Sequence, residues 1–127
     1  MDLAKFLNAR LDDDQWVAEG AARTDDRRQG AWYPAMFGPG GFDARVDDHL
    51  ARHDPGRVLR EVDAKRKIVA EHAMEPGMFP PSCVRCCDTN TAQYPQRWDA
   101  LMWPCPTVRA LAAVWSDHED YDPAWKE

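Results

Sequence analysis

The sequence lacks the features of a secreted or membrane-spanning protein. No run of about 18 apolar residues, the length needed to cross a bilayer, occurs in its 127 residues. The stretch Met1–Lys5 has no basic region followed by an apolar segment, so it does not read as a secretory signal. We therefore expect a soluble, cytoplasmic protein that makes no contact with a membrane.

Positive charge is also scarce. Sixteen lysines and arginines stand against 22 acidic residues, which gives a net charge of -6. Proteins that bind the phosphate backbone concentrate positive charge on one face, so nucleic acid is an unlikely partner for this chain. A nucleic-acid role would require one group of basic residues to form a single exposed patch; these residues are Arg57, Arg60, Lys65, Arg66 and Lys67.

Recognisable catalytic arrangements are missing as well. His49 and His53 are four residues apart, as in zinc metalloproteases, but Leu50 stands where that motif needs its glutamate. No serine or cysteine nucleophile has a recognisable setting near His118. We expect no enzyme: His49 and His53 should line helix packing or support the Asp54 cap, and His118 should anchor the C-terminal tail.

The periodicity of apolar residues predicts a mainly α-helical fold with little or no sheet. A chain of this length suits one domain, residues 1–127. The expected architecture is a small helical domain of about four helices with a metal-stabilised irregular loop. The predicted helices cover residues 2–21, 44–53, 55–74 and 106–115. Between and after them lie a variable loop at 23–43, a metal-binding loop at 75–105 and a C-terminal arm at 116–127.

Two local patterns support these helices. In the first helix, apolar residues including Val17 share one stripe, whereas Trp16 projects away from it. Asp54 followed by Pro55 is a strong start signal for the third helix, because the carboxylate can accept from unpaired N–H groups and proline at the first position loses no hydrogen bond.

The strongest chemical signal is a set of four soft ligands, His72, Cys83, Cys86 and Cys105. The spacing His-x10-Cys-x2-Cys-x18-Cys suits one tetrahedral ion, with two thiolates from a tight turn and outer ligands on neighbouring helices. Cysteines in a reducing cytosol are more often ligands or free thiols than disulfides. The βαβ pattern of a thioredoxin-like redox fold is missing. We therefore predict a structural zinc site.

Cys87 leaves an alternative open. A set of Cys83, Cys86, Cys87 and Cys105 also reaches four ligands, so Cys87 competes with Cys86 and with His72. Adjacent residues rarely reach one small ion together, which favours His72. If Cys87 were a ligand, an iron–sulfur cluster would become the leading hypothesis; otherwise zinc is preferred.

Several segments together resemble a family of small proteins from actinobacteria and their phages that carries a domain of unknown function. The matching segments are His49–Lys67, His72, the Cys83/Cys86 pair, Pro104–Arg109 and Asp117–Tyr121. The resemblance covers residues 1–22 and about 44–125. It implies a phage or prophage context, hence a host cytoplasm, and a metal site at the matching positions, but no activity.

Three classes of function follow from these patterns. The leading hypothesis is a zinc-stabilised protein-interaction or regulatory module, whose acidic surface steers it to a basic host protein. The second is a nucleic-acid-associated zinc protein, and the third is an enzyme with an open metal position. The sequence carries no signal for the identity of the partner or the oligomeric state.

Overall fold

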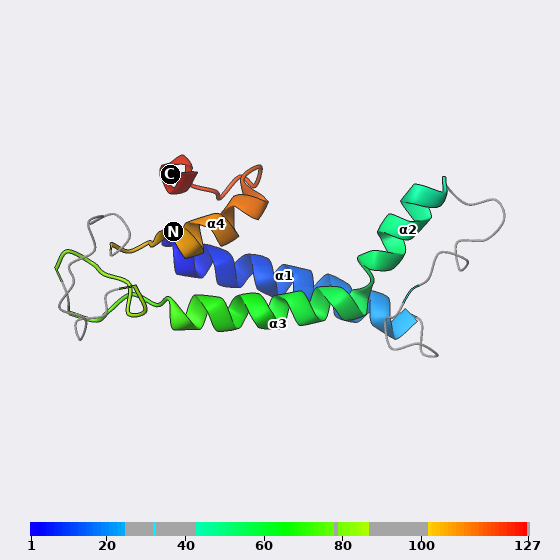
Figure 1. The fold of residues 1–127 in the computed structure, drawn as a ribbon, viewed down its shortest axis with the longest axis horizontal. Helices are drawn as coiled ribbons and strands as arrows, with labels where there is room; N and C mark the ends of the chain where they lie inside the picture. Colours follow the sequence, from blue (N-terminus) through cyan, green and yellow to red (C-terminus); the bar gives the residue numbers. More distant parts are fainter. Residues whose placement is uncertain (25–31, 33–42, 78, 87–101, 127) are drawn as a thin grey trace. The chain divides into compact units, whose positions relative to one another are not determined.

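The structure, a computed structural model, describes residues 1–24, 32, 43–77, 79–86 and 102–126. These residues form four α-helices and two short 3-10 turns (Figure 1). The helices are α1 (Leu3–Thr24), α2 (Ala44–Arg52), α3 (Pro55–Glu71) and α4 (Pro106–Ala112), and the 3-10 turns are η3 (Ala113–Trp115) and η4 (Pro123–Lys126). Over the described ranges, strand pairing is confined to two isolated bridges. The predicted mainly α fold with a loop that carries a His/Cys cluster is confirmed.

The helix bounds differ from the predicted ones by three residues at three ends. Helix α4 ends at Ala112, and the rest of the predicted helix forms the 3-10 turn η3. Helix α1 continues to Thr24, so the first residues of the predicted variable loop are helical. Helix α3 ends at Glu71, three residues before the predicted end. The reason is that the next residues pair with another segment: the carbonyl of Ala73 accepts from the N–H of Val84, and the N–H of Glu75 donates to the carbonyl of Ser82.

The chain divides into two compact units. The first combines Met1–Arg10 with Lys65–Glu127, and the second is Leu11–Ala64. Helices α1 and α3 therefore each contribute residues to both units. The expected single domain stays a prediction. No helix in the described part of the chain is long and apolar enough to cross a membrane.

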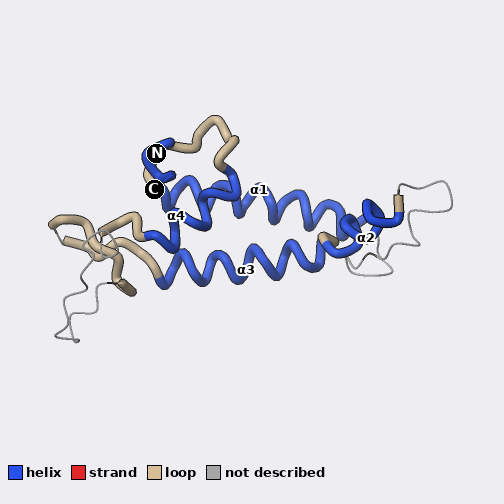
Figure 2. The backbone as a smooth tube through the Cα atoms, turned by 45° about the horizontal axis from the view of Figure 1, so that its top comes forward, coloured by secondary structure: helices blue, strands red, loops and turns tan. Residues whose placement is uncertain are grey.

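The core of the first unit is aromatic. The Phe6 ring lies 5.9 Å from the Tyr121 ring and 5.1 Å from the Trp125 ring, measured between centroids. Tyr121 and Trp125 are both buried, so the C-terminal arm packs back on the helices as predicted. In Figures 1 and 2 the last 3-10 turn, η4, lies beside α4.

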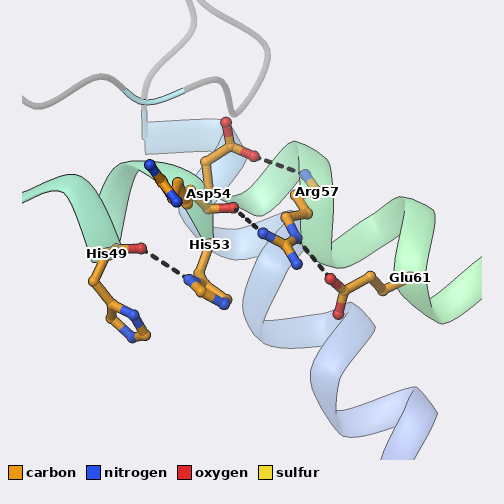
Figure 3. A network of polar contacts seen from close by, with 6 residues as sticks. His49, His53, Asp54, Arg57 and Glu61 are labelled. Carbon is orange, nitrogen blue, oxygen red and sulfur yellow. Dashed lines mark hydrogen bonds and ion pairs between the residues drawn. The ribbon is translucent and has the colours of Figure 1, made fainter.

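The second unit contains the start of α3, where the predicted cap is present (Figure 3). One carboxylate oxygen of Asp54 accepts from the N–H of Arg57 at 2.7 Å, and the other accepts from the N–H of Trp32 at 3.1 Å. The cap therefore also fixes a residue that lies 22 positions away. The Arg57 side chain donates to Glu61 at 2.7 Å and to the carbonyl of Arg52 at 3.1 Å.

The apolar stripe of α1 is only partly buried. Leu11 and Ala18 are buried as the stripe requires, and Trp16 is 73% exposed, as predicted. Val17 is 60% exposed, so its place in the buried stripe was wrong. Residues at the edge of an amphipathic stripe are buried only where another element covers them, as the C-terminal arm covers Phe6 in the first unit.

Candidate metal centre

The structure brings the four predicted ligands together. Nδ1 of His72 lies 3.5 Å from Sγ of Cys83, 3.6 Å from Sγ of Cys86 and 3.5 Å from Sγ of Cys105. No two of the four ligand atoms are more than 4.8 Å apart. The cluster lies in the first unit and joins three separate segments of the chain.

These distances match a tetrahedral zinc site. Bonds of about 2.0–2.1 Å to nitrogen and about 2.3 Å to sulfur at tetrahedral angles place nitrogen and sulfur about 3.5–3.6 Å apart. The three distances from His72 agree with this value. The same geometry places two sulfurs about 3.8 Å apart, so the separations of up to 4.8 Å require only small side-chain shifts to surround one ion.

Backbone pairing around residues 81–84 positions the ligands. This segment pairs on one side with residues 73–75, through a bridge between Met74 and Cys83. On its other side, Ser82 forms a bridge with Met102, and the N–H of Trp103 donates to the carbonyl of Pro81 at 2.9 Å. The segment thus holds the end of α3 and the start of α4 on opposite sides of Cys83.

Each outer ligand stands at a helix end. The N–H of His72 donates to the carbonyl of Ile68 at 3.0 Å, so its backbone continues the hydrogen bonding of α3. Cys105 is the N-cap of α4, and its side chain makes no capping hydrogen bond. Its sulfur is therefore available to an ion, and a thiolate is favoured near a helix N-terminus.

The buried cluster can carry several thiolates only around a cation. Cys83 and Cys105 have no exposed surface, and His72 and Cys86 are half-buried. Burial, followed by hydrogen bonds and charge from Cys83 and Cys105, raises the pKa of the Cys86 thiol to about 12. Thiolates gathered in this way repel one another unless a bound ion neutralises them. The donor set of one imidazole and three sulfurs fits zinc.

The other candidate residues do not join this cluster. His49 and His53 lie in the second unit, are exposed, and stack with ring centroids 4.3 Å apart. Nδ1 of His53 donates to the carbonyl of His49 at 2.8 Å, which ties its ring to the end of α2 (Figure 3). A role of His53 in the Asp54 cap stays a prediction. His118 packs edge-on against Phe6 at 5.8 Å and accepts from the N–H of Asp120, which fits its expected role as an anchor of the tail.

One prediction is untested, and one feature of the site was not predicted. Cys87 lies outside the described residues, so the expectation that it does not ligate stays a prediction. The pairing of residues 81–84 with both neighbours was not predicted, because the prolines around it hide any strand periodicity. The predicted ligand set could have indicated this pairing, since His72, Cys83 and Cys105 can meet only if their segments lie side by side.

The comparisons with known proteins identify a family but no relative of known activity. No curated protein and no solved structure gives a significant match to the chain. The model of a family described as "Family of unknown function (DUF6221)" matches residues 1–127, including residues 23–43, which the resemblance noted from sequence motifs left out. The chain belongs to this family of unknown function.

Proposed function

We propose that the protein is a small protein-interaction or regulatory module held together by a structural zinc ion, without catalytic activity of its own. The observation that carries the proposal is the set of His72, Cys83, Cys86 and Cys105, which offers four ligand atoms to one ion. Structural zinc sites are closed by four protein ligands, whereas catalytic sites keep a position for water. In the described part of the chain, no carboxylate belongs to the set.

Zinc suits the donor set better than the alternatives. Iron–sulfur clusters are usually held by four cysteines, whereas the described cluster contains three cysteines and His72. Magnesium and calcium prefer oxygen ligands and would not select a set rich in sulfur. The Nδ1 atom of His72 lies at the distance from all three sulfurs that a shared zinc ion requires.

The loops that carry the ligands also expose apolar side chains. Phe79 is 96% exposed, and Met74, Val84 and Met102 are each between 43% and 49% exposed. Met74 lies two residues after His72 and Val84 directly follows Cys83, on segments that are paired with each other. Apolar groups on a surface held rigid by an ion are suited to docking on another protein.

A nucleic-acid role has less support. Of the five basic residues on α3, Arg57 is bonded to Glu61 and to the carbonyl of Arg52. The Lys65 ammonium lies 5.3 Å from the centre of the Trp115 ring. Side chains engaged in such contacts are less available to phosphates, and the net charge of -6 opposes general affinity for nucleic acid.

The phage or prophage context implied by the sequence resemblance makes a host protein the proposed partner. A negatively charged module is steered toward positively charged surfaces, which increases the rate of encounter. We therefore place the partner among proteins with a basic surface around an apolar site that accepts Phe79.

The metal part of the proposal is tested on protein purified without added metal. Elemental analysis should give one zinc per chain, and X-ray absorption should show three sulfur neighbours at about 2.3 Å and one nitrogen at about 2.0 Å. A zinc ion with three protein ligands and a water would overturn the closed site and favour an enzyme. Stoichiometric iron would overturn the assignment of the metal.

The interaction part needs a probe at the exposed loop. A photoreactive phenylalanine analogue in place of Phe79 should cross-link to one cellular protein, and a second substitution, Cys83→Ser, should abolish the cross-link. The same analogue in place of the exposed Trp16, in the second unit, is the control and should give no such product. Capture of nucleic acid without protein would overturn the proposal in favour of the nucleic-acid class.

A further inference from the structure

A cavity of about 370 Å³ lies in the first unit, outside the metal cluster. Its walls come from the segment before α4, from α4 itself and from the last 3-10 turn. The described residues that line it are Met102, Trp103, Pro104, Arg109, Ala124 and Trp125. Ligand pockets in proteins have volumes of about 300–1,000 Å³ and combine apolar walls with a few polar groups, and this cavity has both properties.

Arg109 supplies the charge in this cavity. Its Nε atom is shielded from solvent and has no hydrogen-bond partner among the described residues. Leaving a buried donor unsatisfied is costly, and the cost is larger for a charged group. Arg109 lines the cavity, and no acidic residue is found among the described residues of the lining.

Trp103 and Trp125 supply flat surfaces next to this charge. Trp103 is half-buried and Trp125 is buried, and the Trp125 ring is held on its other sides by Phe6 at 5.1 Å and Tyr121 at 5.5 Å. Indole rings fixed in this way present aromatic faces at little entropic cost. An aromatic ring stacks on such a face, and a guanidinium binds a carboxylate or phosphate through two parallel hydrogen bonds.

We propose that this cavity binds a small planar anion, namely an aromatic ring that carries a phosphate or carboxylate group. The ring packs against the indoles of Trp103 and Trp125, which line the cavity, and the anionic group accepts hydrogen bonds from Arg109. The anionic group binds the part of the Arg109 side chain that lines the cavity, because the Nε atom itself is shielded from solvent. Lysine would not serve equally, because the planar fork of arginine matches both oxygens of the anion.

The site is distinct from the metal ligands but is connected to them through the chain. Trp103 and Pro104 directly precede Cys105, and Arg109 donates its N–H to the carbonyl of Cys105 at 3.1 Å. An ion that fixes Cys105 therefore also fixes one wall of the cavity. Binding of the anion needs no partner protein, so it can be tested separately from the proposed interaction.

The test is calorimetric titration of the zinc-loaded protein with four probes. Adenosine monophosphate and indole-3-acetate each combine a ring with an anion, whereas adenosine lacks the anion and inorganic phosphate lacks the ring. At least one of the first two should bind at least tenfold more tightly than adenosine and phosphate. The probe that binds distinguishes a phosphate ligand from a carboxylate ligand. Absence of binding by both ring-containing anions would overturn the proposal.

Variants assign the binding to this cavity. Arg109→Gln should weaken binding by about 10- to 100-fold, the loss expected for a charge-assisted pair of hydrogen bonds. Arg60→Gln removes the same charge from an exposed position on α3 and should leave affinity unchanged. An equal loss of affinity in both variants, or no loss of affinity in Arg109→Gln, would contradict the assignment of the binding site to this cavity.

A second variant keeps the test decisive if Arg109→Gln does not fold, as judged by its zinc content and circular dichroism. Ala124 is exposed and lines the cavity, so Ala124→Glu introduces a carboxylate there without disturbing buried residues. Repulsion between the new carboxylate and the anion should weaken binding at least tenfold. Unchanged affinity in Ala124→Glu would place the bound anion elsewhere and overturn the assignment.

Discussion

Nδ1 of His72 lies 3.5 Å from Sγ of Cys105, although the two residues are 33 positions apart in the sequence. An ion bound between them closes a long loop, as a disulfide does, and restricts the unfolded chain. It also ties the end of α3 to the start of α4 across segment 81–84. Metal binding and folding of the first unit should therefore be coupled.

The first prediction concerns the metal. Cys83→Ser should release the zinc ion and lower the free energy of unfolding by several kcal/mol, because binding energy at a structural site is folding energy. Zinc content by elemental analysis and unfolding by urea, with and without a chelator, measure the two effects. Stoichiometric zinc in this variant would rule out Cys83 as a ligand.

The matched control is the neighbouring cysteine. We predict that Cys87 does not ligate, so Cys87→Ser should keep one zinc per chain and the stability of the original protein. Loss of the metal in Cys87→Ser together with retention in His72→Ala would instead establish the four-cysteine set and bring iron back into consideration.

The second prediction concerns pH. In the metal-free protein, burial raises the pKa of Cys86 from 9.0 to about 12, so the folded state holds this proton more tightly than the unfolded state. The corresponding stability is fully present below pH 9 and is lost as pH rises toward about 12. Chelator-treated protein should therefore lose stability over this range in urea unfolding.

Two comparisons isolate Cys86 from other groups that titrate at high pH. The metal-free Cys86→Ser variant should show a smaller loss of stability between pH 9 and 12, because it lacks the shifted thiol. The zinc-loaded original protein should also show a smaller loss, because its Cys86 is already a thiolate on the ion. An identical pH dependence in all three samples would contradict the assignment.

Some features of the fold were predictable because they depend on local chemistry. The Asp54–Pro55 pair marked the start of α3, since a capping carboxylate and a proline at the first position act within one turn. Helix α4 likewise begins at a proline, Pro106. The grouping of His72, Cys83, Cys86 and Cys105 was also predictable, because histidine and cysteine at such spacings are typical of a metal site, which requires them to meet.

Other features depend on contacts between distant segments. The early end of α3 at Glu71 follows from the pairing of Ala73 with Val84, which competes with helical hydrogen bonding. The exposure of Val17 depends on which elements cover its side of α1. The cavity at Arg109 is assembled from three segments, and nothing in the local sequence around Arg109 marks it as a binding residue.

The third prediction concerns the cap of α3. Asp54→Ala removes the acceptor for the N–H groups of Arg57 and Trp32 and should lower the free energy of unfolding by about 1–2 kcal/mol. Asp54→Asn keeps an acceptor oxygen and should recover most of the loss. Asp48→Ala, at an exposed position of α2, is the control and should change stability by less than about 0.5 kcal/mol. Equal effects at positions 48 and 54 would contradict the capping role.

The last prediction separates the packing of the C-terminal arm from its polar groups. The hydroxyl of Tyr121 is shielded from solvent and has no partner among the described residues. No hydrogen bond to a described residue therefore offsets the free energy of desolvating it. Tyr121→Phe should therefore leave the free energy of unfolding unchanged or raise it by up to about 1 kcal/mol.

Trp125→Ala should instead lower the free energy of unfolding by about 3–5 kcal/mol, because it empties the space beside Phe6 and Tyr121. Urea unfolding of the zinc-loaded variants measures both effects. If Tyr121→Phe lowers the free energy of unfolding by more than about 1 kcal/mol, the hydroxyl has a partner in the folded protein. A Trp125→Ala decrease in the free energy of unfolding below about 0.5 kcal/mol, the size typical of surface changes, would show that the arm does not pack on α1 in solution.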